Sequence, residues 1–307
     1  MTAKNVPLAG WHNNLEIQND HAAVVISLDV GPRILSYHTA HGSNVFKNFP
    51  DQLGKSGEAE WMIRGGHRLW IAPEQEILSY LPDNDPVKHE LLPPNGVRLI
   101  NDGCNPFHVR KELTVSLAED SSEVTVQHRA INEGSEPIEI ATWGLSVMTP
   151  GGMAIIPQPP LGSHPQDLLP NRNIVLWPYT DLSDGRYRIG RHFITLTQGG
   201  GHFPTKIGLA HRMKWVAYLT KDALFVKTFD YVEGEKYPDL GCNFETFANH
   251  EMLEVESLSP LRALLPGQAV EHTEKWYLLG GISKPHSLHE DELEEWIEPL
   301  LAQLGIA

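Results

Sequence analysis

Short runs in which hydrophobic and polar residues alternate fill most of this chain, and they predict β-strands. A period of two places successive side chains on opposite faces, and Val, Ile, Thr and aromatic residues favour the pleated surface of a sheet. Polar turns at 119–122 and 132–135 join several runs, which indicates antiparallel hairpins. The predicted strands cover residues 22–28, 33–39, 109–117, 123–131, 137–148, 189–197, 215–219, 223–232 and 271–279.

One segment near the end of the chain has helical periodicity instead. Ser287, with Glu290 three residues later, has the pattern of a capping box. We therefore expect one helix over 287–304, kinked or split at Pro299 because proline lacks the backbone N–H of a helix interior. The hydrophobic positions that repeat at helical spacing are Leu293, Trp296, Ile297, Leu300, Leu301 and Leu304.

The order of these elements predicts one domain over residues 1–307. Strands do not alternate with helices, so a doubly wound α/β fold is not expected. No repeat of propeller period and no linker divides the chain. Residues 153–178 contain six prolines and predict a long loop across one face. The expected fold is an all-β, antiparallel sandwich with a C-terminal helix packed on it.

Composition removes several classes of partner. The net charge of −15 disfavours nucleic acid and anionic membrane surfaces, both of which need a basic face. Residues 1–10 lack the apolar core of a signal peptide, and no run approaches the ~20 apolar residues of a spanning helix. We expect a cytoplasmic protein in which Cys104 and Cys242, far apart in the sequence, are free thiols. The oligomeric state is not predicted.

Three carboxylates lie inside strand-like segments near the C-terminus. Glu245 directly follows Phe244, and the alternation through residues 253–256 places Glu254 and Glu256 together on one strand face. Carboxylates in such apolar surroundings serve either as structural hydrogen-bond acceptors or as acid–base groups.

A second informative segment reads Gly-Gly-His-Arg-Leu-Trp over residues 65–70. Two glycines permit a bulge or a close backbone approach, which would aim His67 and Arg68. Trp70 offers a flat apolar surface of the kind on which sugar rings stack, and Glu74 adds a carboxylate. The alternative is a structural bulge with an ordinary salt bridge between Arg68 and Glu74.

Other motifs are absent or weak. The 16 histidines form no metal-binding motif, and neither a phosphate-binding glycine fingerprint nor a nucleophile elbow is present. We therefore expect no metal and no cofactor. Gly199–Gly201 predict a flexible turn, which would bring His202 to the rim of a cleft. For the lysines in strand-like segments, we expect side chains that reach solvent; these are Lys206, Lys214 and Lys227.

Short motifs in this order resemble the galactose mutarotase-like (aldose 1-epimerase-like) superfamily. They are Gly-Pro-Arg-Ile-Leu-Ser at 31–36, Gly-Cys-Asn-Phe-Glu-Thr at 241–246 and Leu-Pro-Gly at 265–267. The resemblance covers most of the chain and implies a β-supersandwich with Glu245 as the general base. In such enzymes a strand histidine protonates the ring oxygen; here Trp143 falls where that histidine is expected, so His67 becomes the candidate acid.

The resulting expectation is acid–base interconversion of sugar anomers, with Glu245 as base and His67 as acid facing each other across one cleft. Glu254 and Glu256 would support the site. Two alternatives stay open: a non-catalytic sugar-binding protein, and a lyase or glycoside hydrolase, the latter needing two carboxylates about 5–10 Å apart. The ligand would be a small sugar or an oligosaccharide. The expected substrate-binding residues are Arg68, Trp70, Glu74, Trp143, His202 and Asp239.

Overall fold

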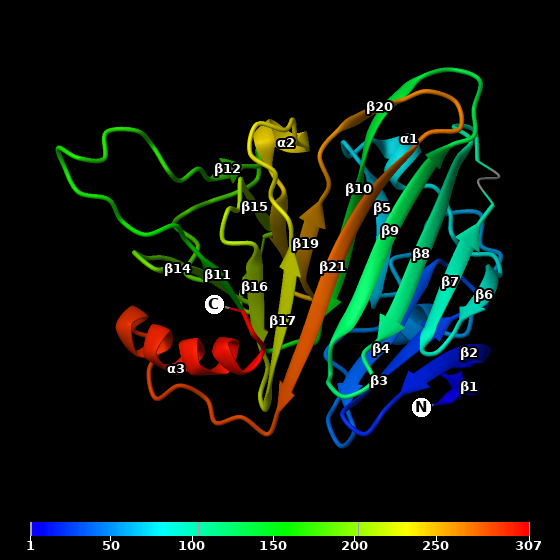
Figure 1. Ribbon diagram of the computed structural model, residues 1–307, viewed down its shortest axis with the longest axis horizontal. Coiled ribbons are helices and arrows are strands. Elements are labelled where there is room, and N and C mark those ends of the chain that lie inside the picture. The colour runs from blue at the N-terminus through cyan, green and yellow to red at the C-terminus, as the bar shows by residue number, and fades with distance from the viewer. Residues whose placement is uncertain (1, 103–104, 202, 307) are drawn as a thin grey trace.

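Two large antiparallel sheets face each other in the computed structural model, which describes residues 2–102, 105–201 and 203–306 (Figure 1). The prediction of an antiparallel β-sandwich with a C-terminal helix is confirmed. Among the described residues, no helix is both long enough and apolar enough to span a bilayer.

The first sheet contains the strands that carry the candidate site. In the described part of the chain its order is β1-β2-β3-β4-β5-β10-β19-β18-β15-β12, with β20 paired to β10. The strands are β1 (Thr2–Leu8), β2 (Trp11–Gln18), β3 (Ala22–Ser27), β4 (Arg33–Thr39), β5 (His67–Ala72), β10 (Ile138–Met148), β12 (Val175–Leu176), β15 (Thr205–Leu209), β18 (Phe244–Ala248), β19 (Leu253–Leu258) and β20 (Arg262–Leu264).

The second sheet covers the inner face of the first. Its order, over the same described residues, is β13-β14-β11-β16-β17-β21-β9-β8-β7-β6. The strands are β6 (Lys88–Leu92), β7 (Gly96–Asn101), β8 (Val109–Leu117), β9 (Val124–Asn132), β11 (Met153–Pro157), β13 (Tyr187–Ile189), β14 (Phe193–Thr197), β16 (Trp215–Leu219), β17 (Ala223–Phe229) and β21 (Ala269–Gly280).

The main hydrophobic core lies between the sheets. Alternation within β17 turns Phe225 toward this core and Leu224 toward the opposite face, where α3 (Glu290–Gln303) packs. Leu293, Ile297 and Leu301 form the buried stripe of α3. The helix lies beside β16 and β17 at one end of the molecule (Figure 1). Three short helical segments complete the fold: η1 (Pro50–Gln52), α1 (Glu76–Ser79) and α2 (Pro238–Gly241).

Two predictions about α3 are wrong. The helix begins at Glu290, with His289 as N-cap, so Ser287 does not cap it. The Glu290 carboxylate does not turn back to close a capping box, because its Oε1 accepts hydrogen bonds from the backbone N–H groups of His192 and Phe193. Pro299 lies inside one continuous helix, so the predicted split is wrong, while the predicted kink stays a prediction.

The proline-rich segment is only partly a loop. Residues 153–157 form the buried strand β11, and residues 175–176 pair with β15 as β12, which leaves 158–174 as the loop. Similarly, the strand predicted over 189–197 is the hairpin of β13 and β14. β11 is fully buried and therefore lacks the polar alternation that predicts a strand, whereas β12, with two residues, is too short to show one.

Candidate functional site

Five adjacent strands of the first sheet, β5, β10, β19, β18 and β15, present one row of side chains on the outer face. In the antiparallel register Arg68 pairs with Leu145, Leu145 with Glu256, and Glu256 with Glu245. Cross-strand partners point to the same face. Their neighbours along the strands, such as Leu69 and Val255, point into the core between the sheets. The expected alternation that places Glu254 and Glu256 together is therefore confirmed.

A pocket of about 180 Å³ opens on this face. Aromatic rings wall it: the ring centroids of Trp70 lie 4.9 Å from Trp61, 4.7 Å from Tyr80 and 5.5 Å from Trp143. Tyr179 adds a further aromatic side chain. The charged residues that line the pocket are Arg68, Glu74, Lys206, Glu254 and Glu256.

Lys206 joins two carboxylates at the deep end of the pocket. Its Nζ lies 2.7 Å from Glu245 Oε2 and 3.3 Å from Glu256 Oε2. The ammonium also sits 4.4 Å from the ring centroid of Trp143, a cation–π distance. Trp143 Nε1 donates to Glu256 Oε2 at 3.0 Å. Lys206 is buried, so the expectation that its side chain reaches solvent is wrong.

Burial changes the acid–base properties of this cluster. Desolvation raises the pKa of Glu256 to about 7, although Lys206 opposes the shift. Desolvation also raises the pKa of Glu245 well above its ordinary value, again against the pull of Lys206. Burial would lower the pKa of Lys206, but the neighbouring carboxylates of Glu256 and Glu245 raise it. Two carboxyl groups that share one ammonium near neutral pH can hold one proton between them.

The second cation of the pocket is also paired. Arg68 Nη1 lies 2.9 Å from Glu254 Oε1, and the guanidinium carbon lies 4.6 Å from the Trp70 ring centroid. Glu74 instead accepts a hydrogen bond from the Tyr80 hydroxyl at 2.7 Å. The alternative of a structural Arg68–Glu74 salt bridge is therefore not what the structure contains.

Several buried polar atoms of this face have no protein partner. Among the described residues, none makes a hydrogen bond with Trp61 Nε1, Trp70 Nε1, Arg68 Nε or Glu256 Oε1. Leaving a buried polar group unpaired costs roughly 1–3 kcal/mol. Donors and acceptors left open in one aromatic pocket are the groups that would orient a polar ligand.

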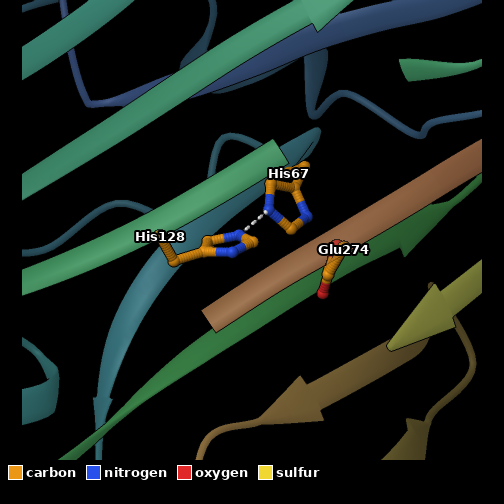
Figure 2. A group of neighbouring side chains, drawn as sticks. All are labelled: His67, His128 and Glu274. Carbon is orange, nitrogen blue, oxygen red and sulfur yellow. Dashed lines mark hydrogen bonds between the residues drawn. The ribbon is translucent and has the colours of Figure 1, made fainter. Parts of the chain in front are cut away.

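His67 does not belong to this pocket. It precedes Arg68 on β5, so its side chain points to the opposite face, into the core between the sheets, where it is fully buried. Its ring lies beside that of His128, and a dashed line joins the two rings in Figure 2. The two Nε2 atoms are 2.7 Å apart. Desolvation, with Lys227 and His128 nearby, lowers the pKa of His67 well below its usual value. The expectation that His67 faces Glu245 across one cleft is wrong.

His67, His128 and Glu274 bring possible metal-ligand atoms within 4.8 Å of one another (Figure 2). The hydrogen bonds nevertheless fit a metal-free state. His128 Nδ1 lies 3.2 Å from the His272 carbonyl, which can only accept, so His128 Nε2 accepts from His67 Nε2. His67 Nδ1 is then the acceptor for the Ser146 hydroxyl at 2.9 Å.

Both carboxylate oxygens of Glu274 also accept hydrogen bonds. It accepts from Lys227 Nζ at 2.9 Å, from Trp276 Nε1 at 2.6 Å and from the Ser257 hydroxyl. A divalent cation would have to break these bonds and share the carboxylate with a buried ammonium. We therefore interpret this group as structural.

Lys227 is fully buried, which corrects the expectation that it reaches solvent, whereas Lys214 is exposed as expected.

The remaining predicted residues divide as follows. Arg68, Trp70, Glu74 and Trp143 all line the pocket. Asp239 lies in α2 outside the lining, with a left-handed φ of 49°. His202 and Cys104 lie outside the described residues, while Cys242 is a buried free thiol.

Sequence reasoning missed some of the pocket. It gave Glu254 and Glu256 supporting roles, yet both line the pocket directly, as does Lys206. The strand alternation already placed the two glutamates on one face. Lys206 gave no comparable signal, since its partners lie about 40 and 50 residues away in sequence.

Solved structures share this fold. A putative aldose 1-epimerase from Klebsiella pneumoniae is 13% identical over 98% of this chain and 86% of its own, with a TM-score of 0.59. A putative mutarotase from Salmonella typhimurium is 10% identical over 91% and 94%, with a TM-score of 0.58. A galactose mutarotase-like protein from Lactobacillus casei is 10% identical over 87% and 100%, with a TM-score of 0.55.

No protein-family model matches the sequence, and neither does any curated protein. At 10–13% identity the structural likeness shows the fold alone. The chain therefore has the galactose mutarotase-like sandwich fold. Its chemistry has to be argued from its own pocket.

Proposed function

We propose that the pocket binds a neutral sugar ring and interconverts its anomers by acid–base catalysis. The observation that carries this proposal is the Glu245–Lys206–Glu256 cluster at the deep end of an aromatic-walled pocket. The mutarotase-like fold agrees with a carbohydrate ligand.

Size limits the pocket to one sugar ring. A cavity of ~150 Å³ holds a benzene ring, and this pocket of about 180 Å³ is only slightly larger, so some hydroxyl groups of a pyranose would extend from its mouth. Trp61, Tyr80 and Tyr179 keep more exposed surface than the buried Trp70 and Trp143, and their rings offer apolar surface for the C–H groups of a pyranose. The open donors of Trp61 and Trp70 and the open acceptor of Glu256 suit its hydroxyl groups.

The pairing of charges favours a neutral ligand. Arg68 is paired with Glu254, and Lys206 with two carboxylates. In the described lining no arginine or lysine is left to neutralise a uronate or a phosphate. This argues against a lyase that acts on uronates.

Mutarotation requires a base for the anomeric hydroxyl and an acid for the ring oxygen, which are bonded to the same carbon. Glu256 lines the pocket and presents the open Oε1, so we assign it the proton exchange with the anomeric hydroxyl. The family resemblance gives the role of base to Glu245. Because Lys206 contacts both carboxylates, we assign this role to Glu245 and Glu256 together. As the bond between the anomeric carbon and the ring oxygen breaks, the Lys206 ammonium would donate a hydrogen bond to the ring oxygen, and the proton that the carboxylate pair took from the anomeric hydroxyl would pass to that oxygen.

A second candidate is a sugar-binding protein without catalysis. The observation that favours it is the lining itself, because no histidine occurs among its described residues and Trp143 stands where a catalytic histidine is expected. The two candidates differ only in whether the bound sugar exchanges its anomers.

Exchange NMR on a panel of freshly dissolved neutral aldoses tests the proposal. We expect the wild-type protein to accelerate anomer exchange for at least one aldose. Glu256→Gln should lower that rate by roughly 10²–10⁴-fold while sugar affinity is retained. Glu139→Gln, at an exposed ion pair with Lys236, is the matched control and should leave the rate unchanged.

Binding without acceleration across the whole panel would establish the non-catalytic reading. Absence of binding by every aldose would overturn both candidates.

A further inference from the structure

A second hollow adjoins the pocket on the same face of the molecule. It is a more open groove of about 660 Å³. Trp61 and Tyr80 line both the pocket and the groove. The two cavities are therefore neighbours that share two aromatic side chains. The other residues that line the groove are Ala59, Glu60, Glu76 and Pro82.

The aromatic rings continue without interruption from the pocket into this groove. Trp143 contacts Trp70, and Trp70 contacts both Trp61 and Tyr80. The centroids of Trp61 and Tyr80 lie 5.3 Å apart, with the ring planes at 84°. Two rings at nearly a right angle can offer different faces or edges to the two cavities.

The groove is also more polar and more exposed than the pocket. Tyr80 is 40% exposed, and Glu60 and Glu76 are exposed carboxylates. No lysine or arginine lies in its described lining. Aromatic surface with carboxylate acceptors at its edge, open to water, matches a hydroxyl-rich neutral ring and not an anionic group.

We propose that this groove is a second sugar subsite, so that the ligand is a neutral disaccharide or a longer chain. The inference rests on the proposed function of the pocket. Anomer exchange needs a free anomeric hydroxyl beside Glu256, so the reducing ring occupies the pocket. The next ring then lies in the groove against Trp61 and Tyr80.

Titration calorimetry with matched sugars tests this inference. The probes are glucose as the monosaccharide and maltose, cellobiose, lactose and melibiose as the disaccharides, all four of which carry glucose as the reducing ring. At least one disaccharide should bind roughly 2- to 12-fold more tightly than its monosaccharide, the gain from one added aromatic contact. The substitution Ala59→Trp, at an exposed position that lines only the groove, should remove this gain and leave the monosaccharide affinity unchanged.

The same substitution at exposed Ala302 on α3 is the control for added bulk, and should preserve both affinities. Disaccharides that bind no more tightly than monosaccharides would overturn the second subsite and leave the proposed function standing. A disaccharide gain that survives Ala59→Trp would also overturn it. If no sugar of either size binds, both the subsite and the proposed function fail.

Discussion

The two faces of the central strands β5, β10 and β19 contact buried polar groups with opposite outcomes. On the inner face, His67 of β5 meets His128, Lys227 and Glu274 of the second sheet, and each side-chain nitrogen and oxygen of this cluster has a hydrogen-bond partner within the described residues. On the outer face, equally buried groups of Arg68, Trp70 and Glu256 have atoms without partners.

Burial of charge alone therefore does not mark the functional face of this sheet. The polar atoms of the inner cluster are all hydrogen-bonded, and these bonds connect the two sheets. For example, Lys227 Nζ donates to the backbone carbonyl of Val255 at 3.1 Å. That carbonyl lies between Glu254 and Glu256, so the inner cluster also fixes the strand that carries the pocket carboxylates. Several open hydrogen-bonding groups that line one pocket, and not a single unpaired atom such as Thr142 Oγ1 on the inner face of β10, distinguish the candidate ligand site from this polar core.

The largest expected effect is on the inner face. Lys227→Met leaves Glu274 buried without its ammonium partner, and breaking a buried pair in this way costs about 3–5 kcal/mol. Chemical denaturation should show this loss in the free energy of unfolding. Lys236→Met, at the exposed pair with Glu139, should change stability little. An equal effect of both substitutions would contradict the structural role of the inner cluster.

The next effect depends on pH and concerns His272. Burial, with His128 adjacent, lowers its pKa to about 3, so the unfolded chain takes up a proton below about 6.5 that the folded chain does not. The contribution of His272 to stability is therefore present above pH 6.5 and is lost as the pH falls toward 3. The penalty of His272→Asn should shrink by about 1.4 kcal/mol per pH unit in this window. A penalty that stays constant between pH 7 and pH 4 would count against this neutral, buried histidine.

The smallest expected effect is that of Glu256 on the outer face. Its contribution to stability changes with pH in the opposite direction to that of His272. Burial raises the pKa of Glu256 to about 7, so the protonated form is favoured in the folded state. Wild-type stability should fall, relative to Glu256→Gln, as the pH rises from about 4.5 through 7. At pH 5 the two proteins should unfold within about 1 kcal/mol of each other. A variant that is much less stable than wild type at every pH would show that Glu256 is structural.

Much of the fold follows from sequence pattern. Alternation is clear in long strands such as β9 and β21, and it also identified the shared face of Glu254 and Glu256. Alternation failed for β11, whose five residues are all buried. The capping-box pattern failed at the start of α3, where the Glu290 carboxylate accepts a hydrogen bond from the backbone of a distant hairpin instead of its own helix. Tertiary contacts of this kind leave no local trace.

Only part of the site could be predicted from the sequence, because tertiary contacts also decide which side chains line the pocket. The motif at 65–70 made both His67 and Arg68 candidate site residues. Strand alternation places these neighbours on opposite faces of the sheet, and it is His67 that points into the core while Arg68 lines the pocket. Gly144 gives a related example. A Cβ there would lie 2.6 Å from Glu274 Oε1, so the inner cluster requires a glycine that the sequence alone did not single out.

The central claim is that the outer face of the first sheet binds the ligand and the inner cluster does not. Indole N–H resonances test it most directly, because tryptophans on both faces are observed in one spectrum. In a ¹⁵N-edited NMR titration with a neutral sugar that binds, the Trp61 and Trp70 indole peaks should move, since both residues line the pocket and neither N–H has a partner among the described residues. The Trp276 peak should stay in place, because its N–H already donates to Glu274. Unmoved Trp61 and Trp70 peaks at saturating sugar, or a shift confined to Trp276, would contradict the assignment of the outer face as the ligand site.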